Sequence, residues 1–142
     1  MSVDTSVNSS RFSSDVYASR LARAARLTSD AGLDALLITP GPDLQYLLGS
    51  KASSFERLIA LVVPADGSIP SVIVPRLELA ALGDSAAEDL SLTLVDWVDG
   101  VDPYALVAAA VPAGSKTAVA DAMPALHFVP LADVFGLSLI HI

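Results

Sequence analysis

Acidic residues at regular spacing are the first candidates for chemistry in this chain. The stretch DWVDGVD places Asp96, Asp99 and Asp102 three residues apart. A calcium loop alternates its carboxylates at every second position and closes with a Glu, so this spacing does not fit a calcium site. We therefore expect Asp102 to cap a helix that begins at Pro103, and Asp96 and Asp99 to face solvent.

Other residue types that could support catalysis are sparse. His127 and His141 are the two histidines, and neither has a second metal-binding side chain at a suitable spacing. The two Gly-Ser-Lys tripeptides, at 49–51 and 114–116, lack the GxxxxGK[ST] order of a phosphate-binding loop. The absence of cysteine excludes disulfides, zinc–thiolate sites and thiol catalysis. We expect no catalytic residue, metal or cofactor site in this chain.

Three residues are candidates for a binding surface. Tyr46 lies in an otherwise apolar helical segment, and Glu56 and Arg57 open an apolar strand. All three flank the carboxyl end of the first predicted strand, where α/β sheets tend to place binding sites. The alternative is structural: Tyr46 as a core aromatic whose hydroxyl reaches a partner, and Glu56-Arg57 as a surface ion pair.

The elements that must position these residues alternate between helix and strand. An apolar face at spacings of three and four predicts a helix over 15–31, which Gly32 ends. Uncharged apolar runs predict strands, and Asp66-Gly67 predicts a hairpin between the second and third. The strands are expected at 34–39, 57–64, 70–75, 90–97 and 116–121, with short helices at 43–48, 76–82 and 103–111. Residues 122–136 fit either a short helix or turn or a fragmentary strand.

This order predicts an α/β fold with a mixed five- or six-stranded sheet flanked by helices. The hairpin makes the sheet mixed rather than purely parallel. Its core is expected to include the apolar residues of the strands and the inner faces of the helices: Leu21, Leu36, Leu37, Ile38, Leu47, Leu61, Val63, Val72, Val74, Leu94, Leu106 and Val119.

Length and charge narrow the class of protein. At 142 residues the chain forms one domain, with a net charge of -8. Residues 30–142 carry four cations against fourteen carboxylates, which argues against a nucleic-acid partner. No apolar run approaches the roughly 18 residues of a membrane helix. Residues 1–14 are Ser-rich without a signal-peptide stretch, so we expect a disordered tail on a cytoplasmic protein.

Five segments in order resemble the N-terminal domain of the creatinase/prolidase/Xaa-Pro aminopeptidase family. They are RLARAARLTSDAGLDALLITP, PDLQYLLG, ERLIALVVP, VIVPRLE and WVDGVDPYALV, within about residues 17–134. These segments are most similar to those of bacterial Xaa-Pro dipeptidases and aminopeptidases. The resemblance implies a non-catalytic domain at residues 15–136 that shapes substrate access, with Tyr46, Glu56 and Arg57 as candidates for the substrate-proximal surface.

The resemblance also implies what lies outside this chain. The family's catalysis takes place in a second domain of pita-bread fold, where two divalent metal ions (Mn, Zn or Co) activate water. The implied partners are that catalytic domain, a second subunit in a homodimer, and short proline-containing peptides as substrate. The isolated chain should be inactive. Two alternatives stay open: a stand-alone α/β binding or interaction module, and a fragment of a creatinase-like amidinohydrolase.

The last six residues, LSLIHI at 137–142, form an apolar run without a cap or polar closure. They resemble the translation of a widely used transposon-end sequencing adapter. We expect them to be an adapter-derived tail rather than part of the domain. The alternative is a genuine last strand. An unselected tail should lie frayed, extended or against an open sheet edge.

Overall fold

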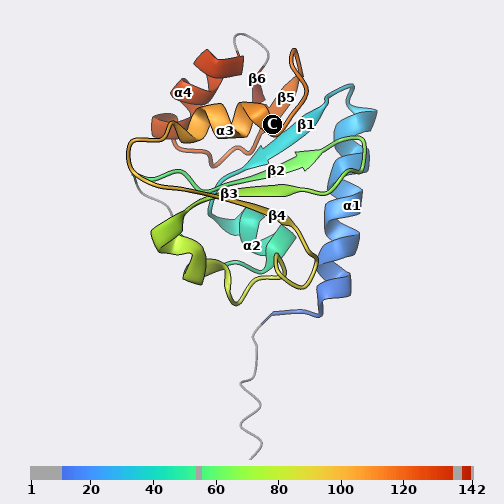
Figure 1. The fold of residues 1–142 in the computed structure, drawn as a ribbon. Coiled ribbons are helices and arrows are strands. Elements are labelled where there is room, and N and C mark those ends of the chain that lie inside the picture. The colour runs from blue at the N-terminus through green and yellow to red at the C-terminus, as the bar shows by residue number, and fades with distance from the viewer. Residues whose placement is uncertain (1–10, 54–55, 136–138, 142) are drawn as a thin grey trace, which may run out of the picture.

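Six strands form one mixed sheet in the order β4-β3-β2-β1-β5-β6 (Figure 1). The structure is a computed structural model that describes residues 11–53, 56–135 and 139–141. The proposed tail at residues 1–14 lies mostly outside the described residues, as does the junction at 136–138. The strands are β1 (Ala35–Ile38), β2 (Ala60–Pro64), β3 (Ser71–Pro75), β4 (Thr93–Trp97), β5 (Thr117–Val119) and β6 (Leu139–His141).

Strand directions place most carboxyl ends at one edge of the sheet. β1 pairs antiparallel with β2 and parallel with β5, while β3 pairs antiparallel with β2 and parallel with β4. β6 pairs parallel with β5. Strand β2 alone therefore runs opposite to the other five. The expected mixed α/β sheet is confirmed, and the predicted hairpin joins β2 to β3.

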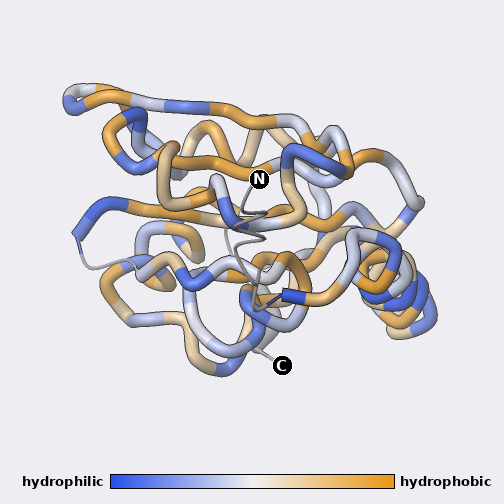
Figure 2. Tube along the Cα trace, turned by 90° about the horizontal axis from the view of Figure 1, so that it is seen from below, coloured by the Kyte–Doolittle hydropathy of each residue, from blue (hydrophilic) through white to orange (hydrophobic). Residues whose placement is uncertain are grey.

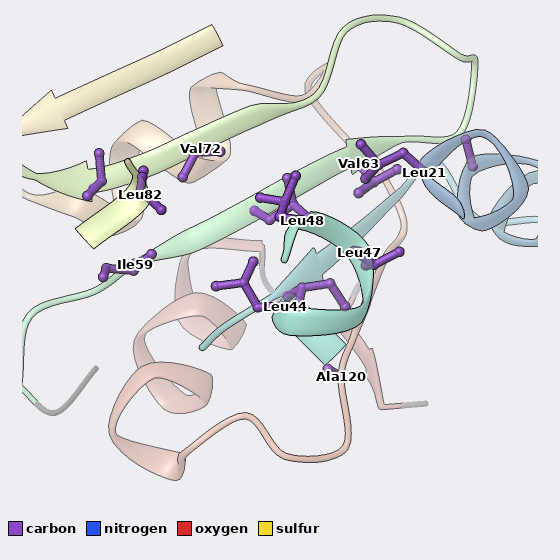
Figure 3. Close-up of a cluster of buried hydrophobic side chains, with 13 residues drawn as sticks. Leu21, Leu44, Leu47, Leu48, Ile59, Val63, Val72, Leu82 and Ala120 are labelled. Carbon is purple, nitrogen blue, oxygen red and sulfur yellow. The ribbon is translucent and has the colours of Figure 1, made fainter. Parts of the chain in front are cut away.

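Helices cover both faces of the sheet. They are α1 (Ser14–Asp30), α2 (Pro42–Leu48), the 3-10 helix η1 (Arg76–Leu82), α3 (Pro103–Ala109) and α4 (Ala125–Phe135). On one face, α1 and α2 pack over β1 to β3 around Leu21, Leu44 and Leu48 (Figure 3). On the other face, α3 and α4 pack through Val107 and Leu131 onto Leu37 and Ile73. The molecule is a three-layer α/β/α domain.

Helix α1 illustrates why these residues form this layer. Tyr17, Leu21, Ala25 and Thr28 are buried along one side, while the opposite side carries Arg23 and other polar residues. Figure 2 shows the resulting alternation of hydrophobic and hydrophilic residues along this helix. Beyond its C-terminal residue, Gly32 adopts φ +76°, a left-handed conformation that glycine tolerates. The predicted amphipathic helix and its glycine stop are confirmed.

Local chemistry also fixes the start of α3. The Asp102 carboxylate accepts hydrogen bonds from the amides of Tyr104 and Ala105, and Pro103 occupies the first turn. This predicted cap is confirmed. At α2, in contrast, Gly41 is the N-cap residue and Asp43 lies inside the first turn, so Asp43 does not cap this helix as Asp102 caps α3.

Strand β4 is shorter than the sequence indicates. The alternation of Leu90, Leu92 and Leu94 predicted a strand from residue 90, but Ser91 has φ +52° and the strand begins at Thr93. Leu94 is 42% exposed, so its assignment to the core is wrong. It lies beside Val72 on the sheet, but β4 is an edge strand and leaves that side chain uncovered.

The rest of the core prediction holds with two residues less buried than expected. Leu36 and Leu106 are partly buried and pack against the two clusters. The remaining nine predicted residues are buried: Leu21, Leu37, Ile38, Leu47, Leu61, Val63, Val72, Val74 and Val119. The segment left open between helix and strand forms α4, which contains Pro130.

The backbone of residues 139–141 lies against the edge of the sheet beside β5. This arrangement matches one of the positions expected for an unselected tail, and it equally fits a last strand. The origin of residues 137–142 stays a proposal.

Candidate functional site

The carboxyl ends of β1, β3, β4 and β5 lie together at one end of the strands, and β2 begins at the same end. We call this end of the sheet the carboxyl edge. This edge is where open α/β sheets place their binding sites. The indole nitrogen of Trp97 at the end of β4 donates to the Leu58 carbonyl just before β2, at 3.1 Å. That bond ties the two segments together below the surface.

Arg57 and Asp99 form an ion pair at this edge. The guanidinium donates from Nε to Oδ1 at 3.0 Å and from Nη2 to Oδ2 at 2.9 Å. This two-point geometry fixes the orientation of both side chains. The sequence had suggested Glu56 as the ionic partner of Arg57, but Asp99 makes the bidentate pair. Asp99, expected to face solvent, is exposed and paired.

The charges around this pair favour the charged forms of both Arg57 and Asp99. The hydrogen bond from Arg57 is the main cause that lowers the pKa of Asp99, and the positive charge of Arg57 adds to it. The pKa of Arg57 is raised, first by its bond to Asp99 and then by the charges of Asp99, Glu78 and Glu56. Oε2 of Glu78 is buried and has no hydrogen-bond partner within the described residues. The guanidinium of Arg57 thus lies among the negative charges of three carboxylates, those of Asp99, Glu78 and Glu56.

Asp96, three residues before Asp99 and inside β4, is also paired with an arginine. It pairs with Arg76, which follows β3, through a bond from Nε to Oδ2. That bond is the main cause that lowers the pKa of Asp96. Two neighbouring strand ends therefore each present an arginine–aspartate pair.

Tyr46 lies on the surface, not in the core. Its side chain is 50% exposed, so the interpretation as a core aromatic is wrong. The guanidinium of Arg20 lies over the Tyr46 ring at 4.1 Å from the centroid, and its Nη1 donates to the Tyr46 carbonyl at 2.8 Å. A cation over the face of an aromatic ring is attracted by the ring quadrupole. The contact joins α1 to α2 and holds Tyr46 in one orientation.

Tyr46 also lines a hollow of about 330 Å³ at the carboxyl ends of β1 and β5, beside α1 and α2. These adjacent parallel strands continue into helices on opposite faces: α2 follows β1, and α4 follows β5. Chains that diverge in this way leave a crevice at the carboxyl ends of the strands. Its wall is apolar, with Ile38, Leu47 and Val119, and the carboxylates of Asp43 and Asp121 border it.

The structure does not bring the three predicted site residues together. Tyr46 lines the crevice between β1 and β5, whereas Arg57 lies against Asp99 beyond the end of β4, and Glu56 is exposed beside it. Sequence reasoning missed Asp121 at the crevice and Arg20 over the Tyr46 ring. The position of Asp121 two residues after β5 was the available signal, whereas the stacking of Arg20 depends on how α1 packs against α2.

A second and larger hollow lies at the opposite edge of the sheet. It measures about 500 Å³ between α1 and the β2–β3 hairpin. Small side chains of α1, Ala18, Ala22 and Ala25, form one wall, and Asp66 and Ser68 of the hairpin lie at the other. The Ser68 hydroxyl donates to the Asp66 carboxylate and is the main cause that lowers the pKa of that carboxyl, and the Ser68 amide adds a second hydrogen bond to it.

The described residues do not fit a catalytic metal. No three His, Cys, Asp or Glu side chains gather closely enough to hold an ion in the described part of the chain. A dinuclear site needs several such ligands around each ion. We therefore derive no metal-dependent step from this domain.

Comparison with known proteins decides the family. The sequence profile of the creatinase/prolidase N-terminal domain matches residues 20–134. The chain belongs to the creatinase/prolidase N-terminal domain family. The resemblance inferred from the five sequence segments is confirmed.

Members of this family with similar sequences are dipeptidases. The chain is 60% identical over 131 residues to "Probable dipeptidase PepE" of Mycobacterium tuberculosis strain H37Rv. This match covers 92% of this chain and 35% of that protein. The crystal structure of dipeptidase PepE from Mycobacterium ulcerans superposes with a TM-score of 0.88 at 57% identity, over 92% of this chain and 35% of that one. This chain thus spans about a third of the length of these relatives.

A more distant structure supports the same fold for the creatinase/prolidase N-terminal domain by itself. The N-terminal domain of an X-Pro dipeptidase from Streptococcus pyogenes superposes with a TM-score of 0.72 at 22% identity. The match covers 87% of this chain and 93% of that structure. No helix within the described residues is long and apolar enough to cross a membrane.

Proposed function

We propose that this chain is the non-catalytic N-terminal domain of a cytoplasmic, metal-dependent dipeptidase that cleaves Xaa-Pro bonds. The observation that carries the proposal is the 60% identity to a dipeptidase of which this chain covers 35%. The described residues, which offer no group of metal ligands, are consistent with chemistry in another domain. In this proposal, two divalent ions (Mn, Zn or Co) are bound by the catalytic domain.

The proposed role of the domain is to limit access to the active site, so that only short proline-containing peptides enter. The intact enzyme is proposed to be a homodimer. Its carboxyl edge offers exposed Tyr46 and the Arg57–Asp99 pair as polar and aromatic contacts. Such groups orient a peptide without taking part in bond cleavage.

The test compares three preparations made from the full-length gene: the whole protein, this domain alone and the remainder alone. Hydrolysis of an Xaa-Pro dipeptide and of a matched Xaa-Ala dipeptide is measured with added Mn. We expect cleavage of the Xaa-Pro peptide by the whole protein and none by this domain. Cleavage by the isolated domain, or equal rates on the two peptides, would contradict the proposal.

The finer proposal concerns Tyr46, Glu56 and Arg57 as substrate-proximal residues. In the whole enzyme, Tyr46→Phe should change the ratio of kcat/KM between dipeptide and tripeptide, because it removes the hydroxyl but keeps the ring. Tyr104→Phe is the comparison variant, since Tyr104 lies on α3 at the other face of the sheet. Its hydroxyl lies 2.9 Å from Nδ1 of buried His127, so the stability of this variant is measured alongside its kinetics. An unchanged ratio in the Tyr46 variant would remove this tyrosine from the substrate surface.

Arg57 and Glu56 are tested in the same way. Arg57→Gln should raise KM for a dipeptide if the guanidinium lies near substrate, whereas Arg76→Gln removes the neighbouring ion pair as a control. Glu56→Gln removes a charge near Arg57 without removing its bidentate partner. A KM equal to that of the unsubstituted enzyme in all three variants would show that the substrate binds elsewhere.

A further inference from the structure

Helix α4 is apolar on both its inner and its outer side. On the inner side, His127 and Leu131 are fully buried against the sheet. On the outer side, Leu126 is 56% exposed and Val129 is 63% exposed. Asp133 is the one carboxylate of this helix, which carries no Lys or Arg. A helix that faces water normally carries mostly charged and polar residues on its outer side.

The outer side of α1 shows what an ordinary solvent-facing helix of this domain looks like. It carries Arg20, Arg23 and Arg26 opposite its buried face. The exposed residues of α4 therefore depart from the pattern that the same chain uses where a helix faces water. Leu126, Val129, Pro130 and Asp133 follow the i, i+3, i+4, i+7 spacing and form one face, which we call the α4 outer face. Asp133 is the one charged residue of this face and lies in the last turn of the helix.

Pro130 adds a polar feature to this face. It lies inside α4 and has no N–H, so the carbonyl of Leu126, four residues earlier, receives no helical hydrogen bond from residue 130. Interfaces commonly combine an apolar core that lacks charged residues with a polar rim.

The position of α4 in the chain identifies the occupant. The family match ends at residue 134, within α4, and the relatives continue for about two thirds of their length outside the part that this chain covers. The family is named for an N-terminal domain, so that remainder follows α4 and is tethered beside it.

We infer that the α4 outer face is the docking surface for the polypeptide that follows this domain in the full-length protein. The inference rests on the proposal that the chain is the N-terminal domain of a longer dipeptidase. Docking covers Leu126 and Val129.

The absence of cysteine from this chain permits a direct test of burial. Leu126→Cys and Val129→Cys are made separately, both in this chain and in the full-length protein. Ile69→Cys is the matched control, because Ile69 is an apolar residue of the β2–β3 hairpin, 63% exposed and remote from α4. The rate at which iodoacetamide modifies each introduced thiol is followed by mass spectrometry of the peptide that contains it.

We expect modification at residues 126 and 129 to slow at least tenfold in the full-length protein relative to this chain, with an unchanged rate at residue 69. Equal rates in the two proteins at both α4 positions would overturn the inference. Slow modification in the isolated chain that becomes faster on dilution would also overturn it, because a second copy would then cover the face.

The labelling result is independent of the peptidase assay. Xaa-Pro hydrolysis is measured on the unsubstituted full-length protein. Slow labelling without hydrolysis would support docking and reject the proposed activity. Fast labelling with hydrolysis would reject docking and support the proposed activity.

Discussion

The contact between Arg20 and Tyr46 is the clearest individual interaction at the carboxyl edge. We expect Tyr46→Ala to lower the free energy of unfolding by about 0.5–1 kcal/mol, because it removes an exposed cation–π contact. Tyr46→Phe should leave stability almost unchanged, since the ring and the backbone carbonyl that Arg20 contacts are both kept. Urea unfolding of the three proteins measures the difference. A loss as large in the Phe variant as in the Ala variant would mean that the hydroxyl, not the ring, stabilises this site.

The ion pair of Asp99 with Arg57 predicts a pH dependence with a definite sign. Because the pKa of Asp99 is lowered in the folded state, its charged form is favoured by folding. The stabilisation is present above the ordinary aspartate pKa of 3.8 and is lost as the pH falls through the lowered folded-state pKa. Asp99→Asn should therefore lower Tm at neutral pH, and the difference from the unsubstituted chain should shrink as the solution is acidified.

Asp133→Asn serves as the control for this titration, since it removes an exposed carboxylate of α4 that is not among the groups acting on the pKa of Asp99 or Arg57. Its Tm difference should not follow the pattern of Asp99→Asn. High salt should also reduce the effect at residue 99, because the pair is exposed. A constant Tm difference at all pH values would show that the charge of Asp99 does not stabilise the fold.

At the scale of elements, the junction of α1 with the end of α2 depends on Gly49. Its φ of +73° lies in the left-handed region, and a Cβ at this position would approach the Tyr17 hydroxyl oxygen to 2.7 Å. Gly49→Ala should cost about 1 kcal/mol for the backbone conformation and a further ~1–3 kcal/mol for the clash. Gly32→Ala is the matched control, with φ +76° and open space around the added Cβ, so it should carry only the first cost.

Tyr17→Phe separates the two contributions at Gly49. It removes the hydroxyl that would clash, so Gly49→Ala should be less destabilising in the Tyr17→Phe background than in the parent chain. Calorimetric melts of the four proteins in this cycle give the coupling. An additive result would show that the hydroxyl oxygen adds nothing to the clash with ring atom Cζ, which lies 2.9 Å from the added Cβ and is kept in both backgrounds.

At the scale of the whole molecule, the last strand is the open question that one truncation answers. If residues 137–142 are an adapter-derived tail, a chain that ends at Gly136 should keep its free energy of unfolding within about 0.5 kcal/mol. It should also be more soluble, because an exposed apolar terminus promotes aggregation. Thermal melts and solubility of the two chains test this.

A chain in which residues 137–142 are replaced by a Gly-Ser segment of equal length controls for chain length. A genuine core strand would behave differently, since its removal should cost at least ~2–5 kcal/mol, the scale of one large-to-small core substitution. A loss of that size would identify residues 139–141 as a native sixth strand.

Local patterns in the sequence determined much of this protein. The period of apolar residues predicted α1, Asp102-Pro103 predicted the start of α3, and Asp66-Gly67 predicted the hairpin between β2 and β3. These features depend on interactions within a few residues, so the sequence contains the information needed to find them.

Only the tertiary structure decided which residues meet across long separations. It paired Arg57 with Asp99, stacked Arg20 on Tyr46, and left Leu94 uncovered because β4 lies at the edge of the sheet. Each outcome depends on strand order and helix packing, which residue spacing does not encode. Tyr46 has the composition of a core residue in its own segment, and only the position of α2 over the sheet places its ring at the surface beside a crevice.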